Sequence, residues 1–223
     1  MNKVLAIIKK DIVTELRTKE LFSSMLLFSL LIIVVFNFAF GFSAEILNLA
    51  APAMLWIAFI FAGILGLSRS FALEKEGNAI MGMLLTPTDR SLIYAGKMIS
   101  NTIFVFIVGI ITVLMFILFF NYDFLSTLIP LIPIVLLGSI GFVSVGTLFS
   151  AMAINTRLRE VLLPILLFPI IIPVIVSAVE LSAQVLDGNT IFEASASLKL
   201  LIAFDIIFVT ACAVTFEYVI DES

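Results

Sequence analysis

Six apolar stretches, each roughly 20 residues long or longer, take up most of this sequence. An α-helix needs a stretch of that length to cross a hydrocarbon layer about 30 Å thick, because it rises only about 1.5 Å per residue. The composition agrees, since 62% of the residues are hydrophobic and only 13% are charged. We therefore predict an all-α integral membrane protein, one membrane domain over 1–223, with transmembrane helices at about 21–42, 51–71, 93–120, 124–154, 161–179 and 198–220.

The lysines and arginines indicate how these helices are oriented. Six spans place successive connections on alternate sides of the membrane, and basic residues are enriched on the cytoplasmic side. On one of the two sides, Lys199 is the only basic residue. The other eleven basic residues all fall on the opposite side: Lys3, Lys9, Lys10, Arg17, Lys19, Arg69, Lys75, Arg90, Lys97, Arg157 and Arg159. We therefore expect both termini in the cytoplasm.

Residues 1–20 are expected to form an amphipathic helix ahead of the first span. Lys3, Lys10 and Arg17 line one face of such a helix. Apolar residues share another face: Met1, Val4, Leu5, Ile8, Ile12 and Leu16. We interpret this segment as an interfacial helix on the membrane surface. The alternative is a basic flank that only sets the orientation of the first span.

The cytoplasmic connection between the second and third spans, residues 72–92, is longer than a turn between two helices requires. It combines a charged start, a short apolar helix over 79–85 and a proline that stops this helix. The residues concerned are Glu74, Glu76 and Gly77, then Leu84 and Leu85, then Pro87. An apolar face exposed to the cytoplasm favours a protein partner. The alternative is a helix that lies on the membrane surface and binds nothing.

The fifth span contains Pro164, Pro169 and Pro173. Each proline removes a backbone hydrogen bond and crowds the preceding turn, which predicts a kinked or locally unwound helix. Such breaks occur at transport pathways, although a merely bent packing helix fits the pattern equally well.

Small residues recur on two spans, at four-residue spacing on the second and three-residue spacing on the fourth. They are Ala58, Ala62 and Gly66, and Gly141, Ser144, Thr147 and Ser150. Faces of this kind let helices approach closely, either within the subunit or at a dimer seam.

Asp205 is an ionisable residue inside the last span. A carboxylate there is costly unless it is paired, protonated or in contact with water, so it is a functional candidate. The alternative is that Asp205 lies shallow enough to reach the outer headgroups.

Several kinds of chemistry find no support in the sequence. The chain has no histidine and one cysteine, Cys212, which argues against a metal site or an internal disulfide. Gly96 and Lys97 are followed by Met98 and lack the rest of a P-loop, so we do not expect ATP hydrolysis by this chain. Uphill transport would need an associated ATPase or an ion gradient, and the sparse intramembrane charge argues against the gradient.

Two blocks of the sequence carry a resemblance to a known family. The first is Phe71, Glu74, Glu76, Gly77, Leu84-Leu85, Pro87, Asp89-Arg90-Ser91, Ile93-Tyr94, Gly96-Lys97 and Asn101. The second is Arg157, Glu160, Leu162-Leu163-Pro164, Pro169 and Pro173-Val174. Together they resemble the haem-exporter B permease of cytochrome c maturation, CcmB, a type II ABC exporter permease.

The resemblance implies a subunit without its own ATPase in the prokaryotic plasma (inner) membrane. Two permease copies would assemble with a CcmA-like ATPase, CcmC-like and CcmD-like membrane subunits and the CcmE-like haem chaperone. No nucleic acid would take part. The segment from Glu74 to Leu85 would be the coupling helix that binds the ATPase. The complex would use ATP to release the haem-loaded chaperone or to transfer haem. Partner subunits would bind both ATP and haem. For haem the reason is that this chain offers no histidine as an axial ligand.

Three other functions stay open at this point. A type II ABC permease that exports a lipid or a drug-like solute would share the coupling helix. An ion-coupled carrier or channel would produce flux in liposomes that contain this chain alone. A purely structural membrane scaffold would produce none.

Overall fold

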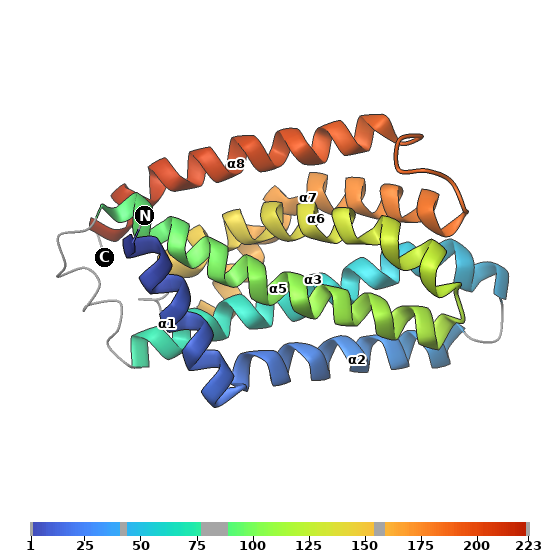
Figure 1. Ribbon diagram of the computed structural model, residues 1–223, viewed down its shortest axis with the longest axis horizontal. Helices are drawn as coiled ribbons and strands as arrows, with labels where there is room; N and C mark the ends of the chain where they lie inside the picture. The colour runs from blue at the N-terminus through green and yellow to red at the C-terminus, as the bar shows by residue number, and fades with distance from the viewer. Residues whose placement is uncertain (1, 41–43, 77–88, 154–158, 222–223) are drawn as a thin grey trace.

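The computed structural model describes residues 2–40, 44–76, 89–153 and 159–221. These ranges contain helices and no strand (Figure 1). The helices are α1 (Asn2–Thr18), α2 (Glu20–Phe40), α3 (Ala44–Glu76), α5 (Arg90–Phe120), α6 (Phe124–Ala153), α7 (Arg159–Leu186) and α8 (Ser195–Asp221).

Six of the described helices, α2, α3 and α5 to α8, are long and apolar enough to cross a membrane. This confirms the prediction of an all-helical protein with six spans. Two helices extend past the expected ends: α3 continues beyond Phe71 to Glu76, and α7 continues beyond Val179 to Leu186. Both extensions contain residues that favour helix, and α7 stops just before Gly188, whose φ of 82° lets the chain turn back.

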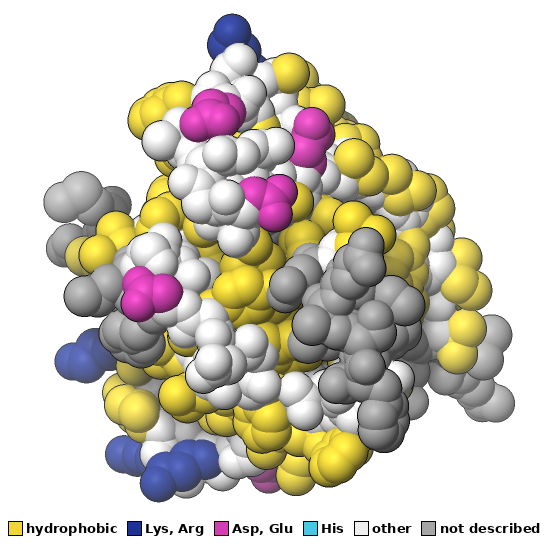
Figure 2. Space-filling model, turned by 90° about the vertical axis from the view of Figure 1, so that its right-hand side faces the viewer, with side chains coloured by type: hydrophobic (Ala, Val, Ile, Leu, Met, Phe, Trp, Pro, Cys, Tyr) yellow, Lys and Arg dark blue, Asp and Glu magenta, His cyan; other side chains and the backbone are white. Residues whose placement is uncertain are grey.

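The two ends of the bundle differ in their charged residues, because the described lysines and arginines other than Lys199 belong to the segments at one end. Both termini, α1, the end of α3 and the start of α5 lie at one end, which we call the basic end (Figure 1). The end of α2, the start of α3 and the turns from α5 to α6 and from α7 to α8 lie at the other, the far end. Figure 2 looks onto the far end and shows acidic side chains spread over its surface, where Asp123, Glu180, Asp187 and Glu193 are exposed.

Helices α3 and α6 form the centre of the bundle, and α2 and α8 lie at its edges. Small residues let these helices approach closely. Ala58 and Ala62 of α3 are buried, and a Cβ on Gly66 would lie 2.4 Å from the sulfur of Met25 on α2. On α6, a Cβ on Gly138 would lie 2.4 Å from the Trp56 ring. The small faces therefore serve packing within the subunit.

Helix α7 is continuous through Pro164, Pro169 and Pro173. The expected local unwinding is therefore absent from residues 159–186, all of which are helical. Proline has a fixed φ that suits a helix, so its cost is one missing hydrogen bond and local crowding. Pro169 and Pro173 face the outside of the bundle, where the proline ring meets fewer neighbours.

Helix α1 crosses the basic end of the bundle and packs mainly on α5 (Figure 1). Gly96 of α5 makes this approach possible, because a Cβ there would lie 2.9 Å from the Ile7 side chain. Glu15 accepts a 2.9 Å hydrogen bond from the backbone N–H of Phe22 and so caps the start of α2. Leu5 and Leu16 stay exposed, so an apolar side of α1 is not covered by the described helices.

Candidate functional site

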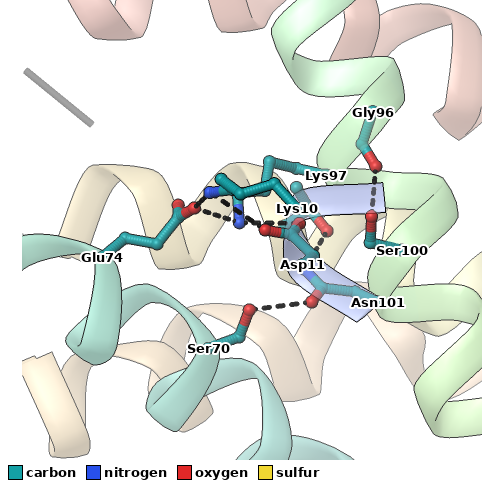
Figure 3. A network of polar contacts seen from close by, with 9 residues as sticks. Lys10, Asp11, Ser70, Glu74, Gly96, Lys97, Ser100 and Asn101 are labelled. Atoms are coloured by element: carbon teal, nitrogen blue, oxygen red, sulfur yellow. Dashed lines mark hydrogen bonds and ion pairs between the residues drawn. The ribbon is translucent and has the colours of Figure 1, made fainter. Parts of the chain in front are cut away.

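Four charged side chains meet at the basic end, inside the angle between α1, α3 and α5. They are Lys10 and Asp11 of α1, Glu74 of α3 and Lys97 of α5, and we call them the charge cluster (Figure 3). Two positive and two negative groups make the cluster neutral. It lies where α3 ends and α5 begins, so it is beside both helices that flank residues 77–88.

Lys97 is the centre of the charge cluster. Its Nζ lies 2.9 Å from Asp11 Oδ2 and also forms an ion pair with Glu74 Oε1. The Lys97 side chain is only 2% exposed and lies over the ring of Phe71, with 5.8 Å between Nζ and the ring centroid. A buried ammonium is costly unless it is paired, so the two carboxylates account for its presence in this apolar helix.

Lys10 closes the cluster from the more exposed side. Its Nζ lies 3.0 Å from Asp11 Oδ1 and bonds to the same Glu74 oxygen that Lys97 uses. Burial alone would lower the pKa of Lys10, but the charges of Glu74 and Asp11 outweigh it and raise the pKa above its ordinary value. Lys10 is therefore charged at neutral pH, as the ion pairs require.

One carboxylate oxygen of the charge cluster has no hydrogen bond. Glu74 Oε2 is buried and has no partner among the described residues. A cavity of about 230 Å³ surrounds the cluster, lined by all four of its side chains together with Thr14, Glu15, Leu21, Ser70, Leu73 and Phe104. The cluster can therefore take up one further donor without breaking an existing ion pair.

Polar contacts continue from the cluster into the bundle. Ser70 of α3 donates a 2.9 Å hydrogen bond to Asn101 Oδ1 of α5. The amide nitrogen of Asn101 lies 3.5 Å from Thr147 Oγ1 of α6. Nearby, the Tyr94 hydroxyl donates to the backbone carbonyl of Ser144 on α6 at 3.0 Å. The bonds of Asn101 join α3, α5 and α6 one turn deeper than the charges, whereas Tyr94 lies about one turn nearer the start of α5 than Lys97.

The structure brings only part of the predicted site together. Glu74 lies in the charge cluster, and Glu76 is the last residue of α3. Gly77, Leu84, Leu85 and Pro87 lie outside the described residues. The three prolines lie along α7, and Asp205 is buried in α8, both away from the cluster.

Sequence reasoning missed the pairing of Lys10, Asp11 and Lys97. It placed Lys10 on a separate charged face of the first helix, whereas the side chain points into the bundle toward Glu74. Lys97 itself was a signal, because it is the only charged residue of α5 after Arg90. Such a charge needs a partner, but the sequence does not show which carboxylate supplies it.

The helices and the charge cluster define a multi-pass membrane protein in which α3 and α5 are joined to the crossing helix α1 at one end. The family model described as "CcmB protein" matches residues 2–220, almost the whole chain. The chain therefore belongs to the CcmB family.

Relatives agree with the family. The chain is 26% identical over 198 residues to "Heme exporter protein B" of Bradyrhizobium diazoefficiens, covering 89% of each chain. It is 24% identical over 186 residues to the protein of the same name in Rhodobacter capsulatus, covering 83% of this chain and 85% of the relative. In Pseudomonas aeruginosa the identity is 26% over 178 residues, with 78% of each chain covered.

Proposed function

We propose that this chain is the permease subunit of an ABC transporter that handles haem for cytochrome c maturation. Membership of the CcmB family, six apolar helices and relatives named for haem export support the proposal. The chain itself hydrolyses no ATP, and a separate CcmA-like subunit supplies the energy. The eleven basic residues then face the cytoplasm of a prokaryotic cell, with the far end in the periplasm.

The charge cluster is the observation that carries the coupling part of the proposal. Residues 77–88 connect α3 to α5 and would include the helix that binds the ATPase. Glu74 and Lys97 lie close to the two ends of that connection and are joined to each other and to α1. A force applied to the connection therefore reaches α1, α3 and α5 together.

The contacts around the cluster determine where such a force would go next. A buried ion pair resists separation because each charge loses its partner in a poorly solvated site. The three helices therefore shift as one unit, and the bonds from Ser70 through Asn101 to Thr147 pass the shift to α6. Closure of the ATPase on nucleotide would in this way change the packing at the centre of the bundle.

Haem itself is assigned to partners of the complex. The chain has no histidine, the commonest axial ligand of haem iron. We propose that two copies of this chain act with the ATPase and with CcmC-like, CcmD-like and CcmE-like subunits. The ATP-driven change would release the haem-loaded chaperone or transfer haem between these partners.

A pair of substitutions in the connection tests the proposal. With Leu84→Asp and Leu85→Asp together, the ATPase should no longer co-purify with the permease, and cytochrome c should no longer mature. The control is Leu84→Met with Leu85→Met, which keeps the apolar surface and should retain both. If the ATPase still binds the Asp variant and cytochrome c still matures, the coupling assignment is wrong.

A second test separates binding from coupling. Glu74→Gln breaks the charge cluster but leaves residues 77–88 unchanged. We expect the ATPase to bind this variant normally, while cytochrome c maturation falls. Equal maturation in Glu74→Gln and the wild type would contradict a role of the cluster in transmission.

One observation favours a second candidate, a type II ABC permease that exports a lipid or a drug-like solute. An open groove of about 660 Å³ runs between α2 and α3 near the basic end. Its lining combines apolar and polar side chains: Glu20, Ser23, Ser24 and Leu27 of α2, and Ile64, Leu65, Ser68, Arg69 and Ala72 of α3. Such a groove suits an amphipathic molecule. Deletion of the gene separates the candidates, because only the first predicts loss of c-type cytochromes.

A further inference from the structure

Asp205 lies deep inside the bundle. The span of α8 covers Ser195–Val219, so Asp205 is ten residues from one end and fourteen from the other. At about 1.5 Å per residue these separations correspond to about 15 Å and about 21 Å. The side chain is 7% exposed, so it points into the protein and does not reach toward the headgroups.

The carboxyl group of Asp205 has no hydrogen-bond partner in the described structure. Both of its oxygens are buried and unbonded. Gly141 of α6 lies directly opposite, and a Cβ at that position would be 2.6 Å from Asp205 Oδ1. The same Cβ would lie 3.1 Å from Val174 of α7 and 3.3 Å from Phe204. The carboxyl group thus fills a space that exists because residue 141 is glycine, between α6, α7 and α8.

Among the side chains that the structure describes, no positive charge faces this carboxyl group from the helices packed around it. α6 has no ionisable residue. On α7, Glu180 bonds to Ser197 near the far end. Arg159 and Glu160 are the first two residues of α7, and their side chains are not among those that the structure describes. On α5, Tyr94 donates to α6 and Lys97 is held in the charge cluster.

The other titratable groups of α8 do not supply a partner either. Lys199 is exposed nearly two turns away toward the far end, and Glu217 is exposed toward the basic end. Cys212 is buried two turns from Asp205. An ionised Asp205 would therefore be a lone charge in an apolar site, which is strongly unfavourable.

The surroundings of Asp205 fit a proton better than a metal ion. A bound cation needs several oxygen ligands around it. Among the described residues, no group of three or more Asp, Glu or Cys side chains could hold a metal ion. The hydroxyls of Ser139 and Ser144 on α6 donate to the backbone carbonyls of Val135 at 2.6 Å and Gly141 at 2.9 Å. A proton needs only one oxygen of the carboxyl group itself.

We propose that Asp205 is a proton-binding site in the middle of the bundle, and that α8 packs against Gly141 only while this site holds its proton. Loss of the proton leaves a carboxylate that must gain water, and water can enter only if α8 separates from α6. The seam between α6 and α8 is therefore sensitive to pH. This proposal does not depend on the proposed function or on any partner subunit.

A hydrophobic carbodiimide tests the protonation state in the full-length protein in nanodiscs. The acid O–H adds across one C=N bond of the reagent: the carboxyl oxygen bonds to the central carbon, the proton moves to nitrogen, and no group leaves. We expect an adduct on Asp205 at neutral pH that decreases as the pH is raised. Asp123 is an internal control, because hydrogen bonds from the hydroxyl and the backbone N–H of Ser126 lower its pKa and keep it ionised.

A second measurement does not require the reagent to reach the site. Asp205→Asn mimics the neutral acid in shape and cannot ionise. We expect the infrared band of a protonated carboxylic acid in the wild type to be lost in this variant. The thermal stability of the two should match at acidic and neutral pH, and the wild type should become the less stable one as the pH rises.

The control variant Asp123→Asn should retain both the acid band and the pH dependence of the wild type. The proposal is overturned if the wild type lacks the acid band, or if its stability relative to Asp205→Asn is the same at every pH. A stabilising effect of sodium on the wild type that is lost in Asp205→Asn would also overturn it, because it would identify a cation as the occupant.

Discussion

Lys97 of α5 and Glu74 of α3 form a buried ion pair at the two ends of the connection 77–88. The pair is part of a neutral set of four charges, so its members depend on one another. Removal of Lys97 alone leaves two carboxylates against Lys10. Removal of both members leaves Lys10 paired with Asp11, 3.0 Å apart, and restores neutrality.

This relationship predicts non-additive stability changes. Lys97→Met and Glu74→Gln should each lower the free energy of unfolding by about 3–5 kcal/mol, the usual cost of leaving a buried charge unpaired. The double variant should lose clearly less than the sum. Thermal unfolding in detergent of the wild type, the two single variants and the double variant measures these stability differences as a thermodynamic cycle.

The control for this cycle is Glu20→Gln. Glu20 pairs with Arg69, but both side chains are more than 40% exposed, and such a pair contributes about 0–1 kcal/mol. Strict additivity of the Lys97 and Glu74 substitutions would show that the two side chains are not coupled.

The pH dependence of Lys10 provides a separate prediction. Its pKa in the folded protein is raised, so its contribution to stability is fully present below the pKa of the unfolded chain, about 10.4. It is lost as the pH rises further through the raised pKa. Lys10→Gln should be less stable than the wild type at neutral pH, and the difference should shrink in alkaline buffer. A difference that is unchanged by alkaline pH would exclude an ionic role for Lys10.

The close packing of Gly138 against Trp56 can be tested by fluorescence, because Trp56 is the chain's single tryptophan. A Cβ at this position would lie 2.4 Å from the Trp56 ring, whose Nε1 donates a 2.9 Å hydrogen bond to Ser182 of α7. Gly138→Ala should displace the ring, shift the Trp56 fluorescence and cost about 1–3 kcal/mol. Leu136→Ala, at an exposed position of α6, should leave the emission unchanged. An unshifted spectrum in Gly138→Ala would contradict the close packing of α3 on α6.

The continuous helix α7 predicts that Pro169 can be replaced without loss of fold. Pro169→Ala restores a backbone N–H donor at an exposed position, so helix content and thermal stability should be equal to or higher than in the wild type. If bending at this proline serves the transport cycle, cytochrome c maturation should fall in the same variant. Normal maturation would leave Pro169 with a packing role only.

The main outline of this protein follows from its sequence because the membrane imposes it. A span must be apolar over about 20 residues, and this requirement can be read along the chain. The same reasoning applies to the basic residues, whose alternation between connections predicts orientation. The two blocks from Phe71 to Asn101 and from Arg157 to Val174 together resemble the CcmB family, and the family model confirms the membership.

The polar contacts could not be read in this way. Lys10 and Lys97 each have several carboxylates that could pair with them. Only the crossing of α1 over α5 brings Asp11 to Lys97 and Lys10 to Glu74. Asp205 was identified as a costly charge, but its burial against Gly141 depends on how α8 is rotated. In a membrane protein the outward and inward faces are both apolar, so hydrophobic periodicity gives little information about that rotation.

The sequence by itself thus determined that the chain crosses a membrane six times, which end is basic and which family it belongs to, because these properties depend on residues added up along the chain. Only the tertiary structure decided that Lys97 meets Asp11 and Glu74, and that Asp205 meets no partner among the described residues. Those outcomes depend on the rotation and crossing of helices, which are set by close packing of side chains from distant segments.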